Sequence, residues 1–173
     1  GYSGTGTAPD VGADEFGGTP ADQSPPAIAF GTLGTGAPRP SRTFTADIVD
    51  RTGVDTLSGT RPRVYYKKSG DANDLTGWKY VEATGSGGSP FSFTIDYSLL
   101  NAGSVSVGDV IQYVVVAQDT VATPNVGAYL GTFAAPPSSV ALAGTAFPIG
   151  GTINSYTIGT PIVNGKSVCP SGC

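Results

Sequence analysis

Short stretches in which apolar and polar residues alternate recur along the chain between residues 27 and 158. In residues 42–50, for example, Phe44, Ala46 and Ile48 alternate with polar residues, and this period of two is typical of a strand with one buried face. The stretch 109–119 is apolar on both faces, which favours a central position in a sheet. Strands are predicted at 27–33, 42–50, 61–68, 77–83, 90–96, 109–119 and 154–158. Seven short strands separated by turns predict an all-β, antiparallel β-sandwich.

The segments outside these strands are rich in glycine and proline, of which the chain has 26 and 14 among 173 residues. Together they are about twice as frequent as in average proteins, which excludes a helical bundle or a coiled coil. Residues 1–26 are interpreted as a linker or the end of a preceding domain, 27–158 as the sandwich, and 159–173 as a tail or the start of a following module.

Between Asp119 and Asn154 lie 34 residues without a convincing strand. Loops of this length are uncommon in compact domains and are usually functional or disordered. Within it, residues 140–142 are compatible with a short strand or a helical turn. We expect this long loop to offer a variable contact surface.

Charge and composition exclude several functions. The formal net charge is −4, which argues against binding to nucleic acid or to an anionic membrane, and no apolar run reaches the length of a membrane span. Because the sequence contains no histidine, a Ser-His-Asp or Cys-His catalytic arrangement cannot form. A pair of carboxylates remains chemically possible, but most of the 11 aspartates fall at predicted turns. We therefore expect no enzymatic activity and no cofactor other than a possible structural calcium ion.

Several of these segments, in order, resemble an Ig-like (fibronectin-III-like) module found in large secreted surface proteins of Bacteroidetes. The resemblance rests on residues 24–28, 42–54, 62–67, 93–97 and 107–119, and it extends over about residues 24–158. Residues 9–16 are similar to the segment that closes a parallel β-helix in the same proteins. The resemblance implies export by the type IX system and an extracellular or cell-surface location.

Three aspartates are candidate calcium ligands. In an Ig-like sandwich the second and sixth strands end at one pole and the first strand begins there, which brings together Asp50, Asp119 and Asp22. Carboxylate oxygens are the ligands that Ca²⁺ prefers, and Asp14 and Glu15 could add further ones. Alternatively, Asp50 and Asp119 only accept hydrogen bonds from turn amides.

Aromatic and basic residues suggest a second kind of site. Trp78, Tyr80 and Tyr65 could form a platform on which a sugar stacks, although a single Trp in a sandwich more often packs in the core. The predicted strand 61–68 carries the basic residues Arg61, Arg63, Lys67 and Lys68, and together with nearby Lys79 it could bind an acidic glycan. The simpler interpretation is a solvated face that discourages association between sheet edges.

Covalent modification is considered at four residues. Thr56 and Thr120 follow aspartates in tripeptides that resemble the acceptor at which Bacteroidetes O-glycosylate exported proteins, although about one such tripeptide is expected by chance. Cys169 and Cys173 could form a small local disulfide in an oxidising compartment, or remain two free thiols.

Three functions follow from these observations. The first is a non-catalytic structural and adhesive module within a bacterial surface protein, whose partners are the flanking domains of the same polypeptide. The second is a carbohydrate-binding accessory module of a secreted enzyme. The third is a filament subunit whose terminal arms pair with identical copies by strand addition.

Overall fold

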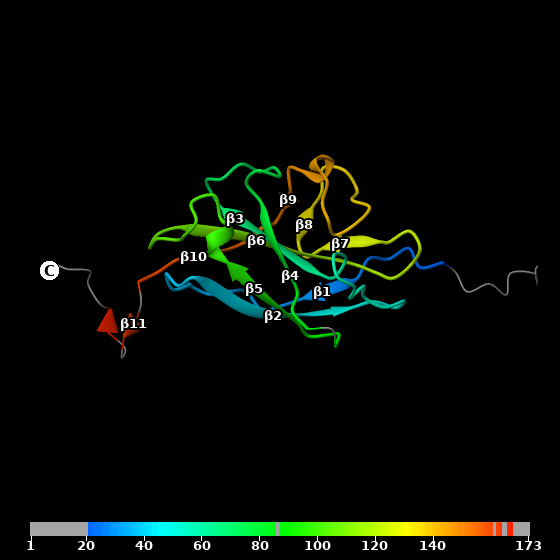
Figure 1. Ribbon diagram of the computed structural model, residues 1–173, viewed down its shortest axis with the longest axis horizontal. Coiled ribbons are helices and arrows are strands. Elements are labelled where there is room, and N and C mark those ends of the chain that lie inside the picture. Colours follow the sequence, from blue (N-terminus) through cyan, green and yellow to red (C-terminus); the bar gives the residue numbers. More distant parts are fainter. Residues whose placement is uncertain (1–20, 86, 161, 164–165, 168–173) are drawn as a thin grey trace, which may run out of the picture.

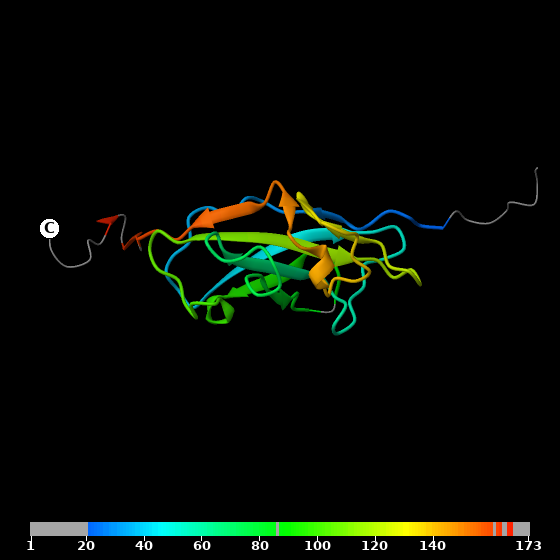
Figure 2. The same ribbon diagram turned by 90° about the horizontal axis from the view of Figure 1, so that it is seen from above.

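The structure, a computed structural model, describes residues 21–85, 87–160, 162–163 and 166–167 (Figure 1). Two antiparallel sheets lie face to face, and their strands run along the long axis of the molecule (Figures 1 and 2). The all-β sandwich predicted from the alternating pattern is therefore confirmed. Among the described residues, no helix is long and apolar enough to cross a membrane.

One sheet has three strands and the other has four, with a short fifth strand at one end. The first has the order β1-β2-β5: Ala27–Ala29, Ser41–Val49 and Phe91–Asp96. The second has the order β10-β6-β3-β4: Asn154–Thr157, Val110–Gln118, Arg63–Lys68 and Lys79–Glu82. β7 (Val126–Ala128) pairs with the last residues of β6. A separate two-stranded sheet joins β11 (Ile162–Val163) to β12 (Lys166–Ser167).

The main core lies between the two sheets. Phe44 on β2 pairs with Phe93 on β5, and their rings stack with centroids 5.3 Å apart. Phe91, Phe93 and Ile95 are fully buried and alternate with half-buried residues, as their sequence pattern predicts. The opposite sheet contributes Ile111, Tyr113 and Val115 to this core.

Residues 120–153 form a layer over the outer face of the second sheet rather than an open loop. They include β7, β8 (Gly131–Thr132), the 3-10 turn η2 (Gly144–Ala146) and β9 (Gly150–Gly151), which pairs with β8. Val140, Phe147 and Ile149 from this layer pack on Val114 and Val116 of β6. β6 is thus apolar on both faces because it separates two cores. The stretch 140–142 is neither a strand nor a helical turn.

The expectation that Arg63 and Lys67 lie on a solvated strand face is wrong. Only 6% of Arg63 and 3% of Lys67 is exposed. The Lys67 ammonium donates to the backbone carbonyls of Lys68, Ser69 and Asp71, at 2.9–3.3 Å, and burial lowers its pKa. These carbonyls satisfy the charge inside the loop that follows β3, so this part of the strand can be buried.

The strand ends define two opposite ends of the sandwich. Ala27 at the start of β1 pairs with Val49 at the end of β2, whereas Thr157 at the end of β10 pairs with Val110 at the start of β6. The described chain therefore enters the sandwich at one end and leaves it at the other, separated by about the length of β6, or roughly 30 Å for nine residues (Figure 1). The first strand, predicted at 27–33, is shorter because the chain leaves the ladder after Ala29.

Candidate metal centre

Three segments meet at the end of the sandwich where the described chain begins, here called the entry pole. They are residues 21–26 before β1, residues 50–55 after β2 and residues 119–125 after β6. Val54 and Asp119 form an isolated antiparallel bridge, and the Thr120 hydroxyl donates to the Thr52 carbonyl at 2.7 Å. These contacts fix the two loops that follow β2 and β6 against each other.

The entry pole brings together the three aspartates predicted from the sequence. One carboxylate oxygen each from Asp22, Asp50 and Asp119 lies within 4.8 Å of the other two. Asp119 is fully buried, and the other two are half-buried. None of the three carboxylates forms an ion pair with a Lys or Arg side chain among the residues that the structure describes.

Asp119 is held by the loop that follows it. Its Oδ1 accepts from the backbone N–H of Asn125 at 2.9 Å and of Val121 at 3.4 Å, and its Oδ2 accepts from Nδ2 of Asn125 at 2.6 Å. The same amide nitrogen also donates to the backbone carbonyl of Asp22 at 3.1 Å. Asn125 thus joins the segment before β1 to the end of β6, a role that nothing in the sequence pattern singled out.

Asp50 and Asp22 also accept hydrogen bonds from turns. Oδ1 of Asp50 accepts from the backbone N–H and the hydroxyl of Thr52, both at 2.8 Å, and Oδ1 of Asp22 accepts from the backbone N–H of Ser24 at 3.0 Å. The structure therefore shows the turn hydrogen bonds that the alternative interpretation expects for Asp50 and Asp119. These bonds leave other oxygens free: Oδ2 of Asp22 is shielded from solvent and has no hydrogen-bond partner in the described part of the chain.

This arrangement is chemically suited to a hard cation. Carboxylates close together repel one another, and an oxygen shielded from water without a donor is unfavourable. Ca²⁺ binds oxygen ligands at 2.3–2.6 Å, so two ligands on opposite sides of one ion are about 4.8 Å apart. The spacing of the three carboxylates fits one Ca²⁺. Asp14 and Glu15, considered as further ligands, lie outside the described residues.

The aromatic residues considered as a sugar platform differ in exposure. Only 3% of Trp78 and 3% of Tyr65 is exposed, whereas 46% of Tyr80 is exposed. Nε1 of Trp78 donates to Oδ1 of Asn73 at 2.8 Å. The Tyr65 hydroxyl donates to the Val140 carbonyl at 2.7 Å, and burial raises its pKa. Their burial favours the interpretation of Trp78 and Tyr65 as core residues.

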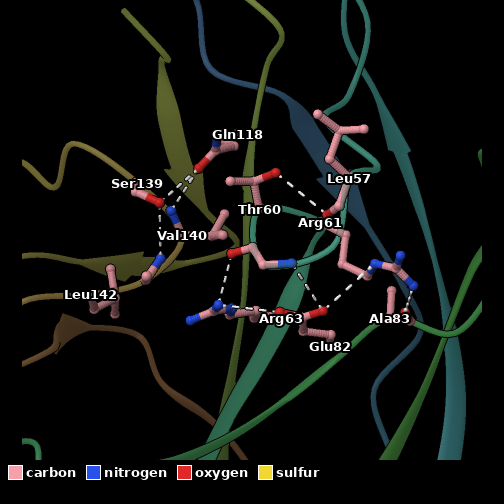
Figure 3. Close-up of polar contacts among 12 residues, drawn as sticks. Leu57, Thr60, Arg61, Arg63, Glu82, Ala83, Gln118, Ser139, Val140 and Leu142 are labelled. Carbon is pink, nitrogen blue, oxygen red and sulfur yellow. Dashed lines mark hydrogen bonds and ion pairs between the residues drawn. The ribbon is translucent and has the colours of Figure 1, made fainter.

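Tyr80, Trp78 and Tyr65 all line one pocket of about 270 Å³. Its other lining residues are Arg63, Leu75, Ala141 and Leu142. The Arg63 guanidinium lies 4.2 Å from the centroid of the Tyr80 ring. It also donates to Glu82 at 3.2 Å (Figure 3). Arg61 lies on the other side of Glu82, with Nε 3.6 Å from Oε2 (Figure 3). The charge of Arg63 is thus partly balanced by Glu82.

The residues considered for modification are only partly described. Thr56 is half-buried and lines a pocket beside Asp50, and Thr120 is exposed and hydrogen-bonded to Thr52. Cys169 and Cys173 lie outside the described residues.

Comparison with models of known protein families and with curated proteins finds no match to this chain.

Proposed function

We propose that this chain is a non-catalytic structural and adhesive module, with an Ig-like sandwich, of a bacterial cell-surface or secreted multidomain protein. The observation that carries the proposal is that the chain enters the two-sheet body at the start of β1 and leaves it at the end of β10, at opposite poles. A module with this geometry adds its own length to a string of domains and holds its neighbours apart.

The strand order supports the Ig-like assignment within this proposal. The three-stranded sheet that contains β1 and β2 faces the sheet that contains β10, β6, β3, β4 and the short β7, and both sheets are antiparallel.

The spacer role is tested on the chain in solution and on cells. By size-exclusion chromatography with light scattering, we expect a monomer at all concentrations from about 10 to 200 μM, a range around that of weak self-association. An antibody raised against the chain should label intact cells of the source bacterium. Labelling only after lysis would overturn the extracellular location, and growth of the scattering mass with concentration would favour the filament subunit.

The pocket beside Tyr80 favours the carbohydrate-binding module as a second candidate. The exposed Tyr80 ring could stack on a sugar, whereas Arg63 is buried and already donates to Glu82 and to the Gly59 carbonyl. A glycan array tests it: binding of a glycan that is lost in Tyr80→Ala would support this candidate. Binding that is unchanged in Tyr80→Ala, or no binding at all, would count against it.

A further inference from the structure

We propose that the entry pole binds one Ca²⁺ through Asp22, Asp50 and Asp119, and that this ion clamps the segment before β1 onto the ends of β2 and β6. The inference goes beyond the spacer role, which requires no metal. Its first support is the convergence of three carboxylate oxygens within 4.8 Å, from residues far apart in the sequence.

The second support is independent of that convergence and concerns burial. Oδ2 of Asp22 is shielded from solvent without a donor, and Asp119 is fully buried with only neutral N–H groups as partners in the described residues. A buried carboxylate normally has a cationic partner or a metal, because removing its charge from water is costly. A bound cation would supply that partner to Asp119 and a ligand contact to Asp22 at the same point.

The donor set points to calcium rather than to another ion. All three side chains offer oxygen, which excludes metals that require sulfur or imidazole ligands. Mg²⁺ binds at 2.0–2.1 Å and demands octahedral geometry, whereas Ca²⁺ accepts longer distances and irregular loops. Asp50 and Asp119 lie in turns directly after β2 and β6, and Asp22 precedes β1. The backbone therefore allows these carboxylates to move only slightly to fit an ion. Water and backbone carbonyls would complete the coordination.

The ion would change how the chain enters the module. Apart from the carboxylates, residues 21–26 are held at the pole by the Asn125 amide, which donates to the Asp22 carbonyl, and by Pro25, which packs on Gly127. With Ca²⁺ bound, Asp22 would be joined to both Asp50 and Asp119. The direction in which a preceding segment leaves the sandwich would then depend on calcium.

The test is calorimetric titration of the full chain, freed of metal with a chelator, with Ca²⁺ and separately with Mg²⁺. We expect a single Ca²⁺ site with a Kd between about 10 μM and 1 mM, the range of sensor and extracellular sites, and much weaker Mg²⁺ binding. At tenfold the Kd, Ca²⁺ should raise the Tm by about 3–6 °C. No Ca²⁺ binding up to about 10 mM, above the range of extracellular sites, would overturn the proposal. Equal affinity for Mg²⁺ would overturn its assignment to calcium.

Variants locate the ion. Asp22→Asn lies outside the sandwich strands, so it should fold normally and lower Ca²⁺ affinity at least about tenfold, a loss equivalent to one charged ligand. Asp96→Asn is the matched control: Oδ1 of Asp96 accepts from the backbone N–H and hydroxyl of Ser98, as Asp50 does from Thr52, but at the opposite end of β2. Asp96→Asn should leave the affinity unchanged. Unchanged affinity in Asp22→Asn, or an equal loss in Asp96→Asn, would contradict the assigned site.

Discussion

Oε1 of Gln118, at the end of β6, accepts a hydrogen bond of 2.9 Å from the backbone N–H of Val140, and both groups are buried. The same oxygen accepts from the Ser139 hydroxyl at 3.1 Å (Figure 3). Nε2 of Gln118 donates to Oδ2 of Asp55 at 3.2 Å. One side chain therefore connects the central strand to the layer formed by residues 120–153 and to the loop after β2. Gln118 is therefore a polar contact between the entry pole and the core that lies under residues 120–153.

Replacing Gln118 with Leu should destabilise the fold by about 1–3 kcal/mol, because the buried Val140 N–H would lose its acceptor. Ser139→Ala is the control: it removes the hydroxyl's bond to the same oxygen and its exposed bond from the Ala141 N–H, but it leaves the Val140 contact, so its cost should stay below about 1 kcal/mol. Urea unfolding measures both. Equal effects of the two variants would show that the Val140 contact is not the important one.

Tyr65 and Tyr80 are paired across β3 and β4, and they offer a matched test of how the layer formed by residues 120–153 is held on the second sheet. The Tyr65 hydroxyl donates to the Val140 carbonyl and accepts from the Leu142 N–H at 3.0 Å. Tyr65→Phe removes both partners from buried backbone groups and should cost about 1–3 kcal/mol in the free energy of unfolding. The Tyr80 hydroxyl has no hydrogen bond within the described residues, so Tyr80→Phe should change stability by less than about 0.5 kcal/mol. A Tyr65→Phe variant as stable as Tyr80→Phe would contradict this account.

The sandwich could be predicted because its strands carry the period-two pattern of a half-buried sheet, as at Phe44, Ala46 and Ile48. The layer formed by residues 120–153 could not be predicted in this way. Its strands β8 and β9 have two residues each, too few to show any period, and they exist only because Gly131 and Gly151 meet in space. The burial of Lys67 could not be predicted from the sequence either, since its partners are backbone carbonyls of a loop rather than acidic side chains.

The convergence of Asp22, Asp50 and Asp119 could be predicted because strand order alone decides which strand ends share a pole. The contribution of Asn125 could not, because an asparagine in a turn has no distinctive pattern. Nor does the sequence tell which carboxylate oxygens are shielded, a property that depends on how the three loops pack.

The ion pair between Lys68 and Asp109 makes stability depend on pH. The Lys68 ammonium, 2.7 Å from Oδ2 of Asp109, holds the pKa of that carboxyl below its usual range, and the Ser106 N–H adds to this effect. Because the folded pKa is lowered, the stabilisation is present above the unfolded pKa of about 3.9 and is lost as the pH falls through the folded value. The stability difference between wild type and Asp109→Asn should therefore shrink from pH 6 to pH 2.5, in urea unfolding experiments. A difference that stays constant over this range would contradict the ion pair's role, and Lys68→Met should reduce the pH dependence in the same way.

Gly127 on β7 should control the position of the segment that carries Asp22. A Cβ at residue 127 would lie 2.9 Å from Cβ of Pro25, too close for either to stay in place, and the exposed proline is the one able to move. Gly127→Ala should therefore speed amide exchange at Ser24, Ala27 and Ile28, the residues around Pro25 and Pro26 that carry a backbone N–H. Since ligands must be held to within about 0.5 Å, it should also lower Ca²⁺ affinity several-fold.

Gly31→Ala is the matched control for Gly127→Ala, because a Cβ at residue 31 meets nothing within 4 Å. It should leave both amide exchange and Ca²⁺ affinity unchanged. Since exchange is measured without metal, it tests the packing of Pro25 on Gly127 even if no ion binds. Unaltered exchange in Gly127→Ala would show that β7 does not hold this segment. Faster exchange with unaltered Ca²⁺ affinity would show that the carboxylates position Asp22 without help from β7.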